Sequence, residues 1–166
     1  MSGTLVLPRL RQLSVADRGR IEEITRAVRL FREDEIPVAL EVFDAAVHEG
    51  GSLDYTALGA DFDGRLAGWI CWGPTPCTLG TYDLYWMAVD PTLQGTGIGT
   101  ALLSEMERRL NGLARLVIIE TTGRADYAGT RAFYSARGYL PVSTIRDFYA
   151  PGDDQVVYVK NMSVER

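Results

Sequence analysis

Hydrophobic and polar positions follow two different periods along the chain, and the period changes near Tyr55. Before it, apolar residues recur every three or four positions, which is typical of amphipathic helices. Ser14 and Asp17 form a capping-box pattern that predicts the start of one helix, and Asp34 caps a second that ends at Gly50–Gly51. The predicted apolar faces are Ile21, Ile24, Val28 and Phe31 in the first helix, and Ile36, Leu40, Phe43 and Val47 in the second.

Strand periodicity follows over the next part of the chain. Asp63–Gly64 favours a tight turn, so Ala57–Phe62 and Arg65–Trp72 are predicted to pair as a hairpin. Thr81–Val89 is apolar at nearly every position, which is typical of a central strand that is buried on both faces. A proline- and glycine-rich loop separates this strand from the hairpin.

The C-terminal half alternates between the two periods. A glycine-rich turn leads into a helix whose apolar face is Ile98, Leu102, Met106 and Leu110. The pattern then predicts a strand, a short helix and two strands at Leu113–Thr121, Tyr127–Arg137, Leu140–Tyr149 and Val156–Met162. Pro151–Gly152 joins the last two strands, and we interpret Asp153–Asp154 as part of a solvated turn.

With a short strand predicted at Arg9–Leu13, the order of elements is β-α-α-β-β-β-α-β-α-β-β. Hairpins are combined with one β-α-β unit, and this order predicts an α+β fold. We expect a central mixed, mostly antiparallel, twisted sheet with helices on both faces. No repeat or linker-like segment interrupts the order, so residues 1–166 are predicted to form a single domain.

The composition limits what this domain can do. A chain of 166 residues, 46% hydrophobic and 23% charged, lies in the range of globular proteins with one core. The net charge of -5 argues against a nucleic-acid surface, which needs clustered cations. No apolar run approaches the ~20 residues that cross a bilayer, and Met1–Leu13 lacks the pattern of an export signal. Cys71 and Cys77 have no companions at metal-ligand spacing, so we expect free thiols in a reducing cytoplasm and no metal site.

The most informative segment runs from Val89 to Thr100, VDPTLQGTGIGT, between the end of a strand and the start of a helix. Its glycines let the backbone approach a ligand, and the N–H groups and dipole of a helix's first turn attract a diphosphate. A dinucleotide-binding fingerprint with Glu120 as ribose ligand is an alternative interpretation. It fails because Pro91–Gln94 separates the strand from the glycines and because position 100 is threonine, not glycine or alanine.

Two segments, Gln94–Gly99 and residues 132–139, contain motifs that resemble those of the GNAT family of N-acetyltransferases. Gln94, Gly97 and Gly99 match motif A of that family, Gln/Arg-x-x-Gly-x-Gly/Ala, after a strand that ends in a Val-x-Pro step. Residues 132–139, AFYSARGY, resemble the short helix of motif B, which ends in Tyr-x-x-x-Gly-aromatic. Tyr127 replaces the asparagine that often opens motif B. The resemblance implies the GNAT fold and an acetyl-CoA-dependent N-acetyltransferase.

The resemblance also implies where the substrates bind. The pyrophosphate of acetyl-CoA would be held by Gln94, Gly95, Thr96, Gly97, Ile98, Gly99 and Thr100. Backbone groups of Met87, Ala88 and Val89 would face the acetyl and pantetheine part, in a gap where this strand splays from its neighbour. Tyr127 would contact the cofactor arm. The family's acceptor pocket lies between the first two helices and the last hairpin, which implies Phe31, Arg32, Trp86 and Tyr149 as acceptor-side residues.

Amine acetylation requires an uncharged amine, a donor to the oxyanion and a proton for the thiolate. By resemblance Tyr134 lies near the sulfur, and its phenol, with an ordinary pKa of ~10, is protonated at neutral pH. Glu120 ends an apolar strand at the edge where open sheets bind ligands, and it is the first candidate for the general base. Asp83 is the second, with a structural ion pair as its alternative role. His48, the only histidine, fits favourable placement at a helix C-terminus.

Two functions are compatible with these residues. The first is transfer of the acetyl group of acetyl-CoA to a primary amine on a small molecule, by direct attack in a ternary complex. The second is a non-catalytic acyl-CoA-binding sensor on the same fold, because fold and cofactor binding do not guarantee turnover. We expect a small-molecule amine as partner, with no nucleic acid and no membrane, and both a monomer and a homodimer fit the sequence.

Overall fold

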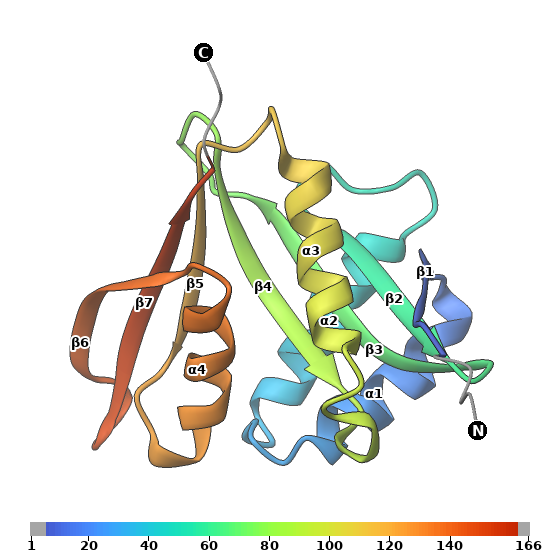
Figure 1. The fold of residues 1–166 in the computed structure, drawn as a ribbon, viewed down its shortest axis with the longest axis horizontal. Helices are drawn as coiled ribbons and strands as arrows, with labels where there is room; N and C mark the ends of the chain where they lie inside the picture. Colours follow the sequence, from blue (N-terminus) through green and yellow to red (C-terminus); the bar gives the residue numbers. More distant parts are fainter. Residues whose placement is uncertain (1–5, 163–166) are drawn as a thin grey trace, which may run out of the picture. The chain divides into compact units, whose positions relative to one another are not determined.

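The computed structural model describes residues 6–162, so residues 1–5 and 163–166 of the predicted domain lie outside the described residues. The helices are α1 (Arg18–Ala27), α2 (Glu35–Val47), α3 (Ile98–Leu110) and α4 (Ala128–Ala136). The strands are β1 (Arg9–Gln12), β2 (Thr56–Phe62), β3 (Arg65–Pro74), β4 (Thr81–Val89), β5 (Leu116–Thr122), β6 (Leu140–Ala150) and β7 (Asp153–Asn161). Short 3₁₀ turns are η1 (Val15–Asp17), η2 (Pro91–Leu93) and η3 (Ala125–Tyr127). The predicted order of helices and strands is confirmed (Figure 1).

Within residues 6–162 the strands form a seven-stranded sheet in the order β1-β2-β3-β4-β5-β7-β6. β4 and β5 pair in parallel, whereas β1–β2, β2–β3, β5–β7 and β6–β7 are antiparallel pairs. The predicted α+β class with a mixed, mostly antiparallel sheet is confirmed. The chain forms two compact units, the first with residues 6–73 and 86–109 and the second with residues 74–85 and 110–162. The single domain over residues 1–166 stays a prediction.

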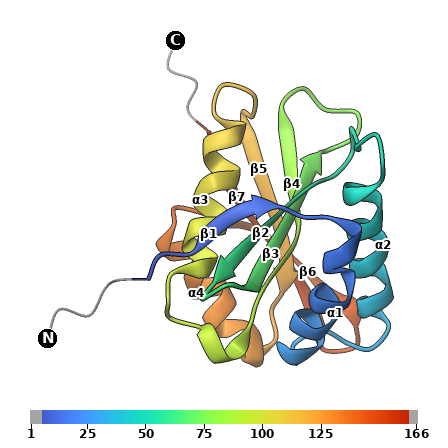
Figure 2. The same ribbon diagram turned by 90° about the vertical axis from the view of Figure 1, so that its right-hand side faces the viewer.

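In the first unit, helices cover both faces of strands β1 to β3 (Figure 2). α1 and α2 lie on one face, where Phe43 and Trp69 are fully buried and meet edge to face with ring centroids 6.0 Å apart. α3 lies on the other face and approaches the backbone at Gly68. A Cβ atom there would lie 3.0 Å from Cγ2 of Ile98 and 3.1 Å from the carbonyl oxygen of Ala88. The absence of a side chain at Gly68 therefore allows the helix that follows the glycine-rich loop to pack closely.

The start of the first helical segment agrees with the sequence pattern, but its end does not. The capping box is present, since the N–H of Ser14 donates to the carboxylate of Asp17 at 2.9 Å. A helix that continues to Phe31 is wrong, because α1 ends at Ala27. Arg29 adopts a left-handed conformation with φ of 57°, which turns the chain out of the helix. Phe31 consequently lies in the connection to α2.

In the second unit, α4 covers one face of the strands β5 and β7 (Figure 1). Val117, Ile119 and Tyr158 are buried there, and Ile119 and Tyr158 are register partners in neighbouring strands. Tyr139 follows α4 and is fully buried. The core of this unit therefore combines aliphatic side chains of the central strand with tyrosine rings.

Two predicted boundaries in the second unit are wrong. β5 begins later than Leu113, because the N–H groups of Leu113 and Ala114 donate to the carbonyl of Leu110 and form a turn at the end of α3. Asp153 is not part of a solvated turn, since it begins β7 and is 7% exposed. Its carboxylate accepts a hydrogen bond from the hydroxyl of Thr122, which provides the partner that a buried charge needs.

Candidate functional site

Asp90 fixes the start of the glycine-rich loop in the first unit. Its N–H donates to the carbonyl of Ala67 at 2.7 Å. Its carboxylate accepts from the N–H of Thr92 at 3.0 Å, from the Thr92 hydroxyl at 2.7 Å and from the guanidinium of Arg20 at 2.6 Å. The hydrogen bonds from Thr92 and then Arg20 lower the pKa of Asp90 below its ordinary value. Arg20 also donates to the carbonyl of Leu66 at 2.9 Å, so it ties α1 to both β3 and the loop.

Sequence reasoning missed this arrangement of Arg20 and Asp90. The Asp90–Pro91 dipeptide is a turn signal that could have identified the carboxylate. No local pattern identifies Arg20, because it is separated from Asp90 by 70 positions. The contact depends on the packing of α1 against the sheet.

The segment Gln94–Gly97 is exposed and leads into α3. Gly95 and Gly97 have φ of 80° and 86°, a conformation that side chains disfavour, and a Cβ at either position would have nothing within 4 Å. In the described part of the chain, the N–H groups of Gly95, Gly97 and Gly99 have no protein acceptor. The loop therefore presents unpaired N–H groups at the positive end of a helix dipole, an arrangement that binds phosphate oxygens.

The strand before the loop contains Met87–Val89, of which Ala88 is buried and the other two are partly exposed. In the second unit, the parallel ladder joins Thr81–Asp83 of β4 to Leu116–Ile118 of β5. Leu84–Tyr85, which belong to the same unit, lie beyond the last pair of that ladder. The end of pairing at this point is what a splay between the strands requires.

Tyr134 lies on α4 in the second unit and is 5% exposed. Its ring centroid is 5.5 Å from that of Phe133 and 6.0 Å from that of Tyr139, with tilted, edge-on geometry. Burial raises the pKa of the Tyr134 phenol above its ordinary value, so the hydroxyl is protonated at neutral pH. Among residues 6–162, no group hydrogen-bonds to this hydroxyl. The phenol is held by ring packing and can still donate to a ligand.

Glu120 and Asp83 also belong to the second unit. Glu120 is exposed near the end of β5, and its pKa is raised, first by partial desolvation and then by the negative charge of Asp83. Asp83 is partly buried and accepts a hydrogen bond from the hydroxyl of Thr75 at 2.6 Å. Among residues 6–162, Asp83 forms no ion pair. The alternative role predicted for it, a structural ion pair, therefore has no support in this part of the chain. Thr75 is a further residue that sequence reasoning missed.

Two predicted acceptor-side residues, Phe31 and Trp86, meet in the first unit with ring centroids 5.0 Å apart and ring planes 40° apart. The indole Nε1 of Trp86 is buried and has no hydrogen-bond partner among the described residues. This N–H can therefore donate to a polar atom of a ligand. Arg32 is exposed, and its guanidinium donates to Asp34 at 3.1 Å.

Tyr127 and Tyr149 lie in the second unit. Tyr127 is 8% exposed in η3, with the guanidinium carbon of Arg124 5.3 Å from its ring centroid. Tyr149 is partly exposed near the end of β6 and packs edge-on against Phe148, with centroids 4.9 Å apart. The predicted site residues thus form local clusters in both units.

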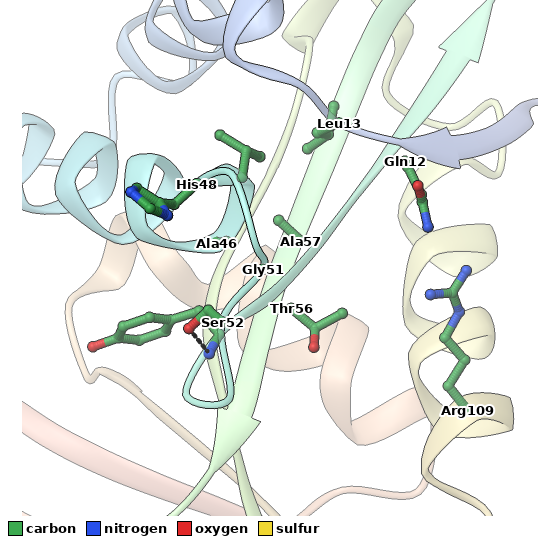
Figure 3. A pocket seen from close by; sticks show the side chains of 11 residues that line it. Gln12, Leu13, Ala46, His48, Gly51, Ser52, Thr56, Ala57 and Arg109 are labelled. Carbon is green, nitrogen blue, oxygen red and sulfur yellow. Dashed lines mark hydrogen bonds between the residues drawn. The ribbon is translucent and has the colours of Figure 1, made fainter.

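A cavity of about 290 Å³ lies in the first unit between the ends of β1 and α2, the start of β2 and one residue of α3 (Figure 3). His48, Ser52 and Arg109 provide polar groups of its lining. Arg109 donates to Glu105 at 2.9 Å, and the hydroxyl of Ser52 accepts from two backbone N–H groups. None of the predicted site residues lines this cavity.

Cys71 is buried and Cys77 is exposed, and both are free thiols. Burial raises the pKa of Cys71 to about 12, so its thiol is protonated at neutral pH. Across residues 6–162, no group of three or more His, Cys, Asp or Glu side chains is placed to hold a metal ion. In the same range, none of the helices combines the length and apolar character of a bilayer span.

Comparison with known proteins identifies similar chains. Residues 20–139 match the sequence profile of the acetyltransferase (GNAT) family. An uncharacterized N-acetyltransferase of Methanocaldococcus jannaschii is 30% identical over 106 residues, which cover 61% of this chain and 63% of that relative. The match therefore spans less than two thirds of the length of that relative.

Two solved structures are similar over nearly the whole chain. A protein assigned to the GNAT family of acetyltransferases, from Desulfovibrio desulfuricans, is 35% identical with a TM-score of 0.85, and the match covers 95% of this chain and 100% of that one. A protein from Salmonella typhimurium, with its cofactor acetyl-CoA, is 17% identical with a TM-score of 0.73, and the match covers 95% of each chain. The second similarity concerns the fold alone.

Proposed function

Because this chain belongs to the acetyltransferase (GNAT) family, we propose that it transfers the acetyl group of acetyl-CoA to a primary amine of a small molecule. The observation that carries the proposal is the loop Gln94–Gly99, whose glycine N–H groups lack protein acceptors at the start of α3. Such a loop binds a pyrophosphate through the backbone, which is compatible with the acidic net charge of the chain. Acetyl-CoA is accordingly the cosubstrate in this proposal.

The proposed reaction starts with proton transfer from the acceptor ammonium to Glu120. The raised pKa of Glu120 makes its carboxylate a stronger base than an ordinary glutamate, directly or through one water molecule. The neutral amine then attacks the thioester carbon, and a backbone N–H of Met87–Val89 stabilises the oxyanion. We assign these roles to the backbone of Met87–Val89 by its resemblance to the family pattern and to Glu120 by its position in the sheet.

Collapse of the tetrahedral intermediate breaks the C–S bond, and the thiolate takes the proton of the Tyr134 hydroxyl. Solvent returns a proton to Tyr134, and it removes one proton from Glu120 and one from the nitrogen as the amide forms, so each turnover releases one proton in net. The raised pKa of Tyr134 guarantees the protonated form but weakens it as an acid. Proton transfer is therefore expected to accompany C–S cleavage rather than precede it.

A panel of amines with acetyl-CoA, followed by release of free thiol, tests the proposed function. The panel contains small aliphatic amines, amino acids and peptides with a free N-terminus. Turnover of small amines in preference to peptides is the expected result. Native mass spectrometry that shows bound CoA without turnover of any amine would favour the acyl-CoA sensor, and turnover of peptides alone would overturn the small-molecule acceptor.

A further inference from the structure

Two carboxylates share one face of the sheet in the second unit. Asp83 of β4 is the register partner of Ile118 in β5, and Glu120 follows Ile118 by two residues. Register partners, and residues two apart along a strand, present their side chains on the same face. With a rise of ~3.3 Å per residue and a strand spacing of ~4.8 Å, the Cα atoms of Asp83 and Glu120 are about 8 Å apart.

This face is the one opposite α4. Val117 and Ile119 alternate with Glu120 along β5 and are 0% and 2% exposed in the core of the unit. Lys160 is the register partner of Val117, so its amino group lies on the α4 side. Val157 is the register partner of Glu120 and is partly exposed on the carboxylate side. The two carboxylates therefore lie beside aliphatic surface and away from the nearest lysine of β7.

Asp83 is held in place by the loop before its own strand. The hydroxyl of Thr75 donates to Oδ2 of Asp83 at 2.6 Å. Thr75 is itself fixed, because its N–H donates to the carbonyl of Thr81 at 2.9 Å and its carbonyl accepts from the hydroxyl of Thr78 at 2.7 Å. The carboxylate is thus oriented by a neutral donor, and Oδ1 has no donor among the described residues.

Within residues 6–162, neither Asp83 nor Glu120 forms an ion pair with a lysine or arginine. The charge of Asp83 instead contributes to the raised pKa of Glu120, after the larger effect of desolvation. Two like charges without compensation cost free energy in the free protein, a cost that a cationic ligand removes.

We propose that Asp83 is a specificity-determining residue that binds a second cationic group of the acceptor, so that linear diamines are preferred over monoamines and amino acids. This inference rests on the proposed acetyltransferase function. Glu120 becomes neutral when it accepts the proton of the reacting ammonium, whereas Asp83 keeps its charge and its second ammonium partner. The spacing of about 8 Å between the two Cα atoms suits an alkyl chain as long as that of 1,4-diaminobutane. An acceptor with a carboxylate in place of the second ammonium is repelled by Asp83.

The test uses three acceptors of matched length: 1,4-diaminobutane, butylamine and 4-aminobutanoate. The wild type is expected to show a kcat/KM for the diamine at least about tenfold above that for butylamine, with 4-aminobutanoate lowest. Asp83→Asn keeps the hydrogen bond from Thr75 through its amide oxygen and removes only the charge. It should lower kcat/KM for the diamine about tenfold more than it lowers kcat/KM for butylamine, because only the diamine has a second ammonium that Asp83 can bind. Asp63→Asn is the matched control, because it removes one exposed charge at the left-handed turn position that asparagine tolerates.

Isothermal titration calorimetry with 1,4-diaminobutane and the unliganded protein gives a readout that needs no turnover. Binding that weakens about tenfold in Asp83→Asn and not in Asp63→Asn supports the diamine site, even if no amine is acetylated and the proposed function fails. Equal kcat/KM for 1,4-diaminobutane and butylamine in the wild type would overturn the inference while acetyltransferase activity stands. If Asp83→Asn lowered kcat/KM by the same factor for 1,4-diaminobutane and butylamine, the inference would be overturned as well.

Discussion

Replacing Gly97 with aspartate introduces a side chain and a negative charge into the loop that is proposed to hold the pyrophosphate. Gly97 has φ of 86°, and a Cβ atom there would have nothing within 4 Å. The substitution therefore causes no clash, and its effect on the unliganded protein is the strain of a left-handed backbone, about 1 kcal/mol for aspartate. In a chain of this size, that strain lowers Tm by about 2–4 °C.

The expected effect on cosubstrate binding is much larger. At an acetyl-CoA concentration of 100 times Kd, binding stabilises the wild type by about 2.7 kcal/mol, which raises Tm by roughly 5–10 °C. A carboxylate ~4 Å from one phosphate charge costs about 4 kcal/mol at an effective dielectric constant near 20. This repulsion exceeds the stabilisation, so acetyl-CoA should no longer raise the Tm of Gly97→Asp.

Differential scanning fluorimetry with and without acetyl-CoA measures both effects. Gly97→Asn is the matched control, because it has the same shape and tolerates the same backbone conformation without the charge. In the asparagine variant, acetyl-CoA should still raise Tm by part of the wild-type increase, which is absent in the aspartate variant. A shift of wild-type size in Gly97→Asp would refute the assignment of this loop to the pyrophosphate.

Four further outcomes follow from the same residues. Tyr134→Phe should lower kcat by about 10²–10⁴-fold with acetyl-CoA affinity nearly unchanged, and a loss below about threefold where chemistry limits the rate would make Tyr134 a packing residue. Because the pKa of Glu120 is raised, its basic form is lost as the pH falls through a value above the ordinary ~4.3. The acid limb of kcat/KM should therefore lie above that pH and disappear in Glu120→Gln; a limb that persists would exclude this base. Tyr149→Ala should raise the KM of the amine more than that of acetyl-CoA, and the opposite order would place the acceptor elsewhere. Arg20→Met should destabilise the protein by about 1–3 kcal/mol in denaturant unfolding and raise the KM for acetyl-CoA, because the hydrogen bond to Asp90 at the start of the loop and the one to Leu66 in β3 are lost; an unchanged KM would show that Arg20 does not position the loop.

The order of helices and strands could be predicted from the sequence because it depends on local rules. Asp63–Gly64 forms its hairpin turn, with both residues at positive φ, as the dipeptide alone indicates. Gly95 and Gly97, in the loop before α3, have left-handed conformations that glycine adopts without strain. Each of these features is encoded within a few neighbouring residues.

Some boundaries were decided by contacts that no local pattern contains. α1 ends before Phe31, although the apolar spacing continues, because Phe31 packs on Trp86 and helps cover the core of the first unit. Asp153 looks like a turn residue in the sequence, yet it is buried as a partner of Thr122. Tertiary packing overrides the local preference in both cases.

The residue types of the proposed chemistry, a glycine-rich loop, a phenol and two strand carboxylates, can be identified from the sequence. How these groups are held depends on the fold. The Arg20 contact with Asp90 joins positions that are 70 apart. The shared face of Asp83 and Glu120 depends on the register between β4 and β5, and a shift by one residue would place them on opposite faces. Sequence specifies what each side chain can do, but register and long-range packing determine which side chains act together, because those are properties of the folded chain as a whole.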